Sequence, residues 1–329
     1  MFKVSVVVPF YNASRYIEKC VISLMEQKLD AVEYIFIDDG STDNSLTILN
    51  HVLSLYPSRK VATRIVSRCN KGVTFSRNEG MQLATGRYLI FIDSDDWVES
   101  NFLDLMYEKA TMYSSDIIIC DYISHNVSGV NYISQKFEPN ENCQLIKSIF
   151  NDDVQGFLWN KLIKTDLYKD VNGFDLDINY MEDILCLIKL IFKSKVITYL
   201  PEGLVHYNRL NENSITSNIS DQKIIDIQRS MEKIEEFSIL NGIYDEIEIE
   251  LNLMKLRQKI WIIHCYKGRA NIVIKSLFID ANRYIKYIKN KPYFKLLSFL
   301  VSIRWYIMIE FVVLAKLYVS DLKVSFRKS

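Results

Sequence analysis

The sequence contains few of the residues that interrupt folded structure or connect domains loosely. Only 10 of its 329 residues are Gly and 5 are Pro, which argues against long flexible linkers. Lys and Arg balance Asp and Glu at 40 each, so no overall charge favours nucleic acid as a partner. With 49% hydrophobic residues, the chain can fold as one large α/β domain with an appendage, or as two modest domains.

Cysteine motifs and a secretion signal are also missing. The first residues lack a basic region followed by an apolar core and a cleavage site, so we predict no signal peptide and a cytoplasmic protein. The cysteines form neither a Cys-x-x-Cys pair nor the spacing of a zinc site, which predicts reduced, buried thiols without a disulfide framework. They are Cys20, Cys69, Cys120, Cys143, Cys186 and Cys265.

No uncharged apolar run reaches the length of about 18 residues that a bilayer-spanning helix needs. The strongest candidate, residues 294–319, is interrupted by Arg304, Glu310 and Lys316. From residue 281 onward, ten Lys and Arg stand against two acids, with aromatic residues between them. This composition suits a membrane surface, where anionic lipids attract basic residues, but it also suits a helical core or a dimer interface.

Strand-like and helix-like segments alternate over the first 120 residues. Helical patterns occur at residues 14–25, 44–55, 73–84 and 99–112. Apolar runs typical of buried strands occur at residues 4–9, 34–37, 62–67, 88–92 and 117–120. The alternation predicts an α/β fold with a doubly wound, mostly parallel sheet, in which ligands bind beyond the carboxyl ends of the strands.

The pattern changes after residue 122. We expect an ordered segment at 156–164, a helix at 181–192, short strands at 196–200 and 204–207, and a polar loop at 208–218. Beyond residue 220 only helices are predicted, at 221–240, 244–266, 271–289 and 294–319. The predicted organisation is an α/β domain over residues 1–218, with halves at 1–100 and 101–218, and an all-helical region over 219–329.

Two acidic clusters follow predicted strands. Asp93, Asp95 and Asp96 end one strand, and carboxylates two residues apart on a turn can converge on a divalent cation. The alternative is a solvated acidic turn that caps the next helix. Residues 38–43 end another strand, where a carboxylate can accept a hydrogen bond from the imide N–H of uracil. The alternative there is simple capping of the following helix.

Two further clusters lie at predicted helix starts. Lys71 and Arg77 put cations in a loop and the first turns of a helix, which suits phosphate or ribose, unless they form an exposed helical face. Glu182 and Asp183 precede a strongly apolar helical stretch. A carboxylate there can take a proton from a hydroxyl within hydrogen-bonding reach, or it can simply favour the helix dipole.

The order and spacing of these clusters resemble the inverting glycosyltransferases of family 2, which have the GT-A fold. The resemblance extends over roughly residues 3–216 and is tightest up to about residue 99. Each motif is modest, but the ordered set is specific. The matching segments are residues 4–12, 38–43, 70–72, 76–78, 93–96 and 182–183.

The resemblance implies roles for individual residues. Asp183 would be the general base, with Glu182 beside it. Asp95, together with Asp93, would bind Mn²⁺ or Mg²⁺, and Asp96 would face the sugar at the acceptor side. Contacts with the nucleotide-sugar donor would come from Pro9, Tyr11, Asp39, Lys71, Arg77, Asp93, Ser94 and Asp95, with Asp39 at the base.

Later residues match more loosely. Arg209 and Ser214 look like the pair that contacts the diphosphate in the capsule and lipopolysaccharide branch of the family. His206 resembles a late histidine that binds the metal in some GT-A enzymes, although a histidine that ends a strand is the alternative. Trp159 and Lys161 are candidates for the acceptor site, although core packing explains Trp159 equally well.

The resemblance implies a metal-dependent, inverting transfer of a sugar from a UDP-hexose or UDP-N-acetylhexosamine to a glycan hydroxyl. The acceptor would be lipid-linked, in bacterial surface polysaccharide synthesis, with the enzyme peripheral on the cytoplasmic face of the membrane. Two other functions stay open: a catalytically silent nucleotide-sugar-binding module and a nucleotide-sugar pyrophosphorylase. Residues 9–14 lack the glycine-rich loop of a pyrophosphorylase, and the intact Asp95 and Asp183 argue against a silent module.

Overall fold

The computed structural model describes residues 1–138, 141–211, 219–266, 276–289 and 291–325. The chain forms two compact units, Met1–Asn213 and Ser214–Ser329, and each has a hydrophobic core of its own. The predicted domain boundary, at residue 218, lies in a segment outside the described residues.

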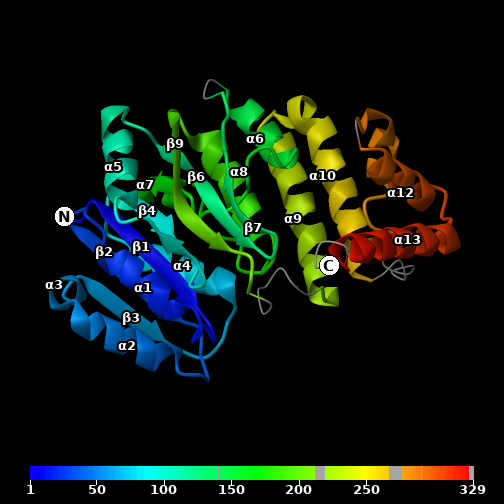
Figure 1. Cartoon of the computed structure of the whole chain (residues 1–329). Coiled ribbons are helices and arrows are strands. Elements are labelled where there is room, and N and C mark those ends of the chain that lie inside the picture. The colour runs from blue at the N-terminus through cyan, green and yellow to red at the C-terminus, as the bar shows by residue number, and fades with distance from the viewer. Residues whose placement is uncertain (139–140, 212–218, 267–275, 290, 326–329) are drawn as a thin grey trace. The chain divides into compact units, whose positions relative to one another are not determined.

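The first unit is built on a nine-stranded sheet in the order β3-β2-β1-β4-β8-β6-β9-β5, with β7 paired to β6 (Figure 1). Strands β1, β2, β3 and β4 are mutually parallel. The short β8 runs antiparallel to both β4 and β6, and β9 runs parallel to β6. The strands are β1 Val4–Phe10, β2 Val32–Asp38, β3 Thr63–Ser67, β4 Tyr88–Phe91, β5 Trp97–Val98, β6 Ile117–Asn126, β7 Gly129–Ile133, β8 Lys161–Lys164 and β9 Ile197–Asn208.

This topology confirms the predicted α/β class with a mostly parallel sheet. Since β8 is antiparallel to both β4 and β6, and β9 is parallel to β6, the strands β4, β6 and β9 run in the same direction and end at the same edge of the sheet. The predicted strands at 196–200 and 204–207 are one strand, β9, which crosses an irregularity in its pairing around Asp121. Of the predicted segment 156–164, only the last four residues form a strand.

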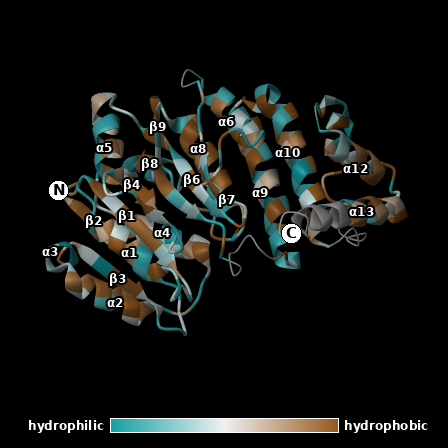
Figure 2. Cartoon of the chain, in the orientation of Figure 1, coloured by the Kyte–Doolittle hydropathy of each residue, from teal (hydrophilic) through white to brown (hydrophobic). Residues whose placement is uncertain are grey.

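Helices cover both faces of the sheet. Val4, Val6 and Val8 of β1 pack with residues of α1 and α2 in the main core. Val7 faces the opposite way, toward α4, where a Cβ on Gly80 would lie 2.2 Å from its Cγ1. In Figure 2 the central strands of the sheet are coloured largely as hydrophobic. The helices are α1 Ile17–Met25, α2 Ser45–Leu55, α3 Pro57–Lys60, α4 Val73–Leu83, α5 Phe102–Met112, α6 Asn142–Phe150, α7 Thr165–Asp170 and α8 Glu182–Lys193.

The second unit is helical where it is described, as predicted, but its later helices differ from the prediction. Of the expected helix 271–289 the structure describes residues 276–289, and within them Asp280–Tyr287 form a 3-10 helix, η1. The expected helix 294–319 is two helices, which separate at Arg304, a residue with a left-handed φ of 60°. The helices are α9 Asp221–Leu240, α10 Tyr244–Cys265, α12 Pro292–Ser302 and α13 Tyr306–Ser325. Over the described residues, none of the helices is long and apolar enough to cross a membrane.

The cysteines are all free thiols, as expected. Cys20, Cys120 and Cys186 are buried. Cys69 and Cys265 are exposed, so the expectation of burial is wrong for these two.

Candidate functional site

The predicted polar clusters lie at one edge of the sheet, because the strands that carry them are parallel. Tyr11 follows β1, Asp39 follows β2, Asp93 follows β4 and Arg209 follows β9. Pro9 is buried within β1, whereas Tyr11 is half exposed. This is the edge at which open α/β sheets bind their ligands.

Asp39 lies in a cradle of hydrogen-bond donors. Its carboxylate accepts the backbone N–H groups of Lys71 at 2.8 Å and Gly72 at 2.9 Å, and it pairs with the Arg68 guanidinium. The same guanidinium bonds to Glu79 at 2.7 Å. Asp39 is buried, so these contacts fix its orientation at the end of β2.

Arg68 is a site residue that sequence reasoning missed. It lies directly after β3, at the same edge as the other clusters. Its place immediately after the predicted strand 62–67 could have identified it from the sequence. Lys71 was predicted to contact the donor, but it reaches Asp39 through its backbone, and its ammonium lies 4.4 Å from the centre of the Phe75 ring.

The loops after β1 and β2 are tied together. The Asn12 side chain accepts the N–H of Thr42 at 2.8 Å. Asp43 accepts the N–H of Ser45 at 3.0 Å at the start of α2 and the N–H of Ser14 at 3.0 Å. Although its partial burial opposes the effect, these hydrogen bonds lower the pKa of Asp43 to about 2. Asp43 therefore binds the first N–H of α2, next to the N-cap residue Asn44, in keeping with the alternative interpretation of this part of the 38–43 segment.

Arg77 joins two carboxylate motifs that lie far apart in the sequence. It is buried in α4, and its Nη2 lies 3.0 Å from Oδ1 of Asp93. Its Nη1 contacts the carboxylate of Glu182, at the start of α8. Arg77 was predicted to contact the donor, but its terminal nitrogens already bind these two carboxylates. The structure thus brings the 93–96 turn beside the Glu182–Asp183 pair.

The start of α8 is held in an unusual backbone conformation. Met181, immediately before Glu182, has a left-handed φ of 65°, which costs free energy in a residue other than glycine. The preceding segment is anchored to α4, because the Thr74 hydroxyl donates to the carbonyl of Ile178 at 2.6 Å. Asp183 is half buried, and its Oδ1 accepts the N–H of Ile184 at 2.8 Å.

The end of β9 is tied to the 93–96 turn. Asp96 is buried, and its Oδ1 accepts the N–H of Asn208 at 2.8 Å. Its Oδ2 is also buried and has no hydrogen-bond partner among the residues described. Asp95 accepts a 2.8 Å hydrogen bond from Asn211. Ser94 is half buried and Arg209 is exposed, whereas Ser214 lies outside the described residues.

The site carries more negative than positive charge. Asp93, Asp95, Asp96, Glu182 and Asp183 gather around a single buried guanidinium. Burial raises the pKa of Glu182 to about 7 and raises the pKa of Asp183, although Arg77 opposes both shifts. Burial and the neighbouring carboxylates likewise raise the pKa values of Asp95 and Asp96. This repulsion favours a bound cation.

In the described part of the chain, no three His, Cys, Asp or Glu side chains are grouped so that they could hold a metal ion by themselves. The residues fit a different kind of site. Mg²⁺ in enzymes is often held by one or two carboxylates, with substrate phosphates and water supplying the other ligands. Asp93 and Asp95 can supply that share, and the unpaired Oδ2 of Asp96 adds to the demand for positive charge.

Both ring nitrogens of His206 lie within hydrogen-bonding distance of protein side chains. Its Nδ1 lies 2.9 Å from Nε2 of His125, and its Nε2 lies 2.8 Å from Glu99. Its ring also stacks on Trp97, with centroids 5.0 Å apart. Metal binding through either nitrogen would require one of these hydrogen bonds to break, so the structure favours the alternative of a satisfied histidine in a strand.

The two acceptor candidates on the 155–161 segment are buried in the core, which for Trp159 is the alternative that the sequence left open. Trp159 is 2% exposed and packs against both Phe157 and Tyr207, with centroids 5.3 Å and 5.2 Å away. Lys161 is 0% exposed. Neither side chain can contact an acceptor unless the surrounding residues move.

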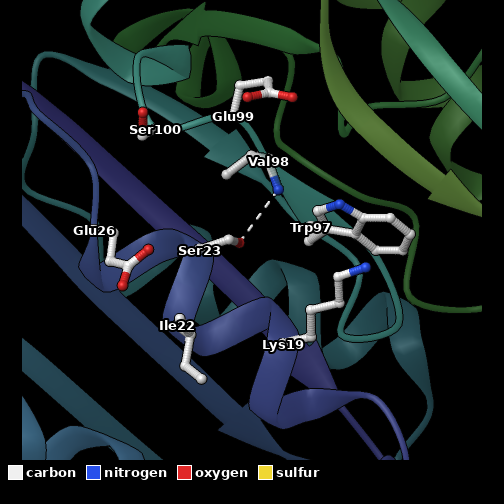
Figure 3. A pocket seen from close by; sticks show the side chains of 8 residues that line it. All are labelled: Lys19, Ile22, Ser23, Glu26, Trp97, Val98, Glu99 and Ser100. Atoms are coloured by element: carbon white, nitrogen blue, oxygen red, sulfur yellow. Dashed lines mark hydrogen bonds between the residues drawn. The ribbon is translucent and has the colours of Figure 1, made fainter.

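A cavity of about 320 Å³ lies beside the 93–96 turn, between α1 and residues 97–100 (Figure 3). The Lys19 ammonium lies over the Trp97 ring, 3.0 Å from its centre, and the Ser23 hydroxyl accepts the N–H of Val98 at 3.2 Å. None of the carboxylates at 93–96 or 182–183 lines this cavity, so it is not the place where those groups act.

Replacing Arg77 by Met should lower the free energy of unfolding by about 3–5 kcal/mol, because it leaves the buried carboxylate of Glu182 without its cation. The double variant Arg77→Met/Glu182→Gln should recover part of the loss. Urea denaturation measures both. Equal stabilities for the single variant and the wild type would contradict the central role of this ion pair.

The chain is similar in sequence to known glycosyltransferases. Over 220 residues the chain is 30% identical to the uncharacterized glycosyltransferase EpsJ of Bacillus subtilis, an alignment that covers 65% of this chain and 62% of that protein. Over 201 residues it is 33% identical to the poly(ribitol-phosphate) beta-glucosyltransferase of Bacillus spizizenii, covering 60% and 30% of the two chains. The chain therefore spans less than two thirds of the length of these relatives.

The fold is similar to that of TarS from S. aureus, solved as residues 1–349 in complex with UDP-GlcNAc. The TM-score is 0.71 at 19% identity, covering 96% of this chain and 91% of that chain, which supports the predicted GT-A fold class. The family model described as glycosyl transferase family 2 matches residues 5–170, from β1 to the end of α7. Since that match covers half of the chain, the protein belongs to glycosyl transferase family 2.

Proposed function

We propose that the protein is a metal-dependent, inverting glycosyltransferase that moves a sugar from a UDP-sugar to a glycan hydroxyl. The observation that carries the proposal is the contact of Asp93 and Glu182 with one guanidinium. Because Arg77 joins them, a candidate base at the start of α8 lies beside the carboxylate turn after β4. A donor held at that turn would present its anomeric carbon to a hydroxyl at Asp183.

The uridine specificity rests on Asp39. A carboxylate acts as an acceptor, and the imide N–H of uracil is a donor of the matching kind. The contacts with Lys71, Gly72 and Arg68 orient this carboxylate at the end of β2, next to Pro9 and Tyr11. TarS, whose fold is similar, was crystallised with UDP-GlcNAc.

Asp95 and Asp93 would hold a divalent cation together with the diphosphate of the donor. When bound, the cation supplies positive charge that stabilises the departing diphosphate. Arg209, exposed at the end of β9, would add a second positive charge on the same side.

Asp183 would act as the general base in a single displacement. The acceptor oxygen forms a bond to the anomeric carbon while the bond from that carbon to the diphosphate oxygen breaks, and the hydroxyl proton passes to Asp183. Attack opposite the leaving group inverts the anomeric centre. The glucosyltransferase of B. spizizenii acts on a poly(ribitol-phosphate), which supports a polymeric surface glycan as the acceptor class.

The helical unit would hold the enzyme at an anionic membrane surface, where a lipid-linked acceptor is presented. Helices α12 and α13 and the turn between them expose large apolar side chains, among them Phe299, Trp305 and Phe311 at 51%, 59% and 68%. Exposed basic side chains lie among them: Lys291, Lys295, Arg304 and Lys316. Apolar burial and attraction to anionic lipids act together at such a surface.

Asp183→Asn should lower the transfer rate by about 10²–10⁴-fold, the usual contribution of a positioned base, with the donor Kd almost unchanged. In the wild type, activity should fall as the pH drops through the pKa of Asp183, which burial raises, because only the ionised carboxylate accepts a proton. A panel of nucleotide sugars, scored by released nucleotide diphosphate, measures the rate. An equal loss of donor affinity would place Asp183 in the nucleotide pocket instead.

Asp95→Ala should abolish transfer while the protein stays folded, because the leaving diphosphate loses its counter-charge. EDTA should have the same effect on the wild type, and added Mn²⁺ should restore activity. Asp104→Ala, an exposed acid in the first turn of α5, is the matched control and should keep full activity. Wild-type turnover in EDTA would rule out the metal assignment.

The triple variant Phe299→Ser/Trp305→Ser/Phe311→Ser should stop the protein from co-sedimenting with vesicles that contain anionic lipid. Ile239→Ser/Leu240→Ser, which removes exposed apolar side chains from the end of α9, is the control and should still sediment. If the wild type ignores vesicles and the triple variant converts a dimer into a monomer, the patch is a subunit interface.

A further inference from the structure

The Lys161 side chain is completely buried, yet all of its hydrogen-bonding capacity is used. Its ammonium donates to the carbonyl oxygens of Gln155 at 2.8 Å and Phe157 at 2.7 Å, and to Oδ1 of Asn160 at 2.7 Å. An ammonium has three N–H donors, so each one has an acceptor. These bonds close residues 155–161 into a tight loop around the charge.

The closed loop touches both parts of the candidate site. On one side, a Cβ on Gly156 would lie 2.5 Å from Ile184 Cγ1, so the loop backbone rests directly on the first turn of α8. On the other side, Phe157 packs against Tyr207 in a tilted arrangement, with ring centroids 5.6 Å apart. Tyr207 immediately precedes Asn208, whose N–H holds Asp96. The loop therefore lies between the element that carries Asp183 and the strand that fixes Asp96.

The charge of Lys161 also acts on Asp183. Among the described residues, the charged groups that act on Asp183 are the cations Arg77 and Lys161 and the carboxylates Asp93 and Glu182. Lys161 opposes the effect of burial on the pKa of Asp183. Burial lowers the pKa of Lys161 itself to about 7, so its positive charge is fully present only below that pH. In that range, loss of this ammonium would make Asp183 harder to ionise.

We propose that Lys161 is a positioning residue for sugar transfer: by closing the 155–161 loop between α8 and β9, it fixes Asp183 relative to the donor-binding turn. This inference rests on the proposed role of Asp183 as the base. It also replaces the expected contact between Lys161 and the acceptor, since a side chain with no exposed surface acts through its neighbours.

The test compares Lys161→Met, which removes charge and hydrogen bonds, with Lys161→Gln, which keeps an amide donor but no charge. Lys164→Met is the control: it makes the same change on the same strand, where the lysine pairs with Asp116 at 2.6 Å. Lys161→Met should lower kcat by about 10–100-fold, the cost of a misplaced catalytic group, with little change in the KM for the donor. In both Lys161 variants the acid limb of the pH–rate profile should move to higher pH, while Lys164→Met leaves it in place.

Hydrogen exchange of the folded proteins provides a readout that does not depend on activity. Lys161→Met should raise exchange in residues 155–160 and in the first turn of α8, and Lys164→Met should not. If Lys161→Met does not fold, as judged by thermal melting, Lys161→Gln carries both measurements.

An unshifted acid limb together with unchanged exchange at residues 182–186 would overturn the inference. Failure of the proposed function is distinguishable: the wild type would then transfer no sugar, or Asp183→Asn would stay active. The exchange result would still report whether the loop supports α8.

Discussion

The buried guanidinium of Arg77 holds the 93–96 turn beside the start of α8. Moving the charge of Arg77 out of water costs several kcal/mol unless carboxylates compensate it, and Asp93 and Glu182 do so from different parts of the chain. The position of α4 is set in turn by the close approach of Gly80 to Val7. Gly80 thus helps to set the position of the Arg77 guanidinium, and the pairing of Arg77 with Glu182 helps to set where α8 begins.

The charge balance of the site bears on how it would accept the strongly anionic donor of the proposed function. Five carboxylates around one arginine would repel a diphosphate, so the cluster by itself is suited to binding a cation rather than an anion. A cation held at the 93–96 turn would reverse this, attracting the diphosphate while leaving Asp183 as a base on the acceptor side. Burial raises the pKa values of Asp95, Asp96, Glu182 and Asp183, so the protonation of these four acids would respond to a cation bound beside them.

The sequence predicted the parallel part of the sheet well, because apolar runs that end in polar clusters are a local signal. Asp39, Asp93 and Asp95 lie where those runs end. The partners of Arg77 were not predictable in this way, since Glu182 lies 105 residues further along the chain. Lys161 was expected at the acceptor and Trp159 was left undecided for a related reason: polar and aromatic side chains look alike in sequence whether they face a ligand or fill a core.

Long-range pairing also governs the order in which the site can be assembled. The contacts of Thr74 with Ile178, Asp96 with Asn208 and Asp95 with Asn211 span 104, 112 and 116 residues. Contacts of such high sequence separation form slowly, after local elements have folded. On the ribosome, the first four parallel strands can therefore come together well before Glu182 is available to neutralise Arg77. A growing chain would carry the 38–43 and 93–96 clusters before Glu182, Asn208 and Asn211 exist to hold them in place, so the candidate site is complete only once residue 211 has been made.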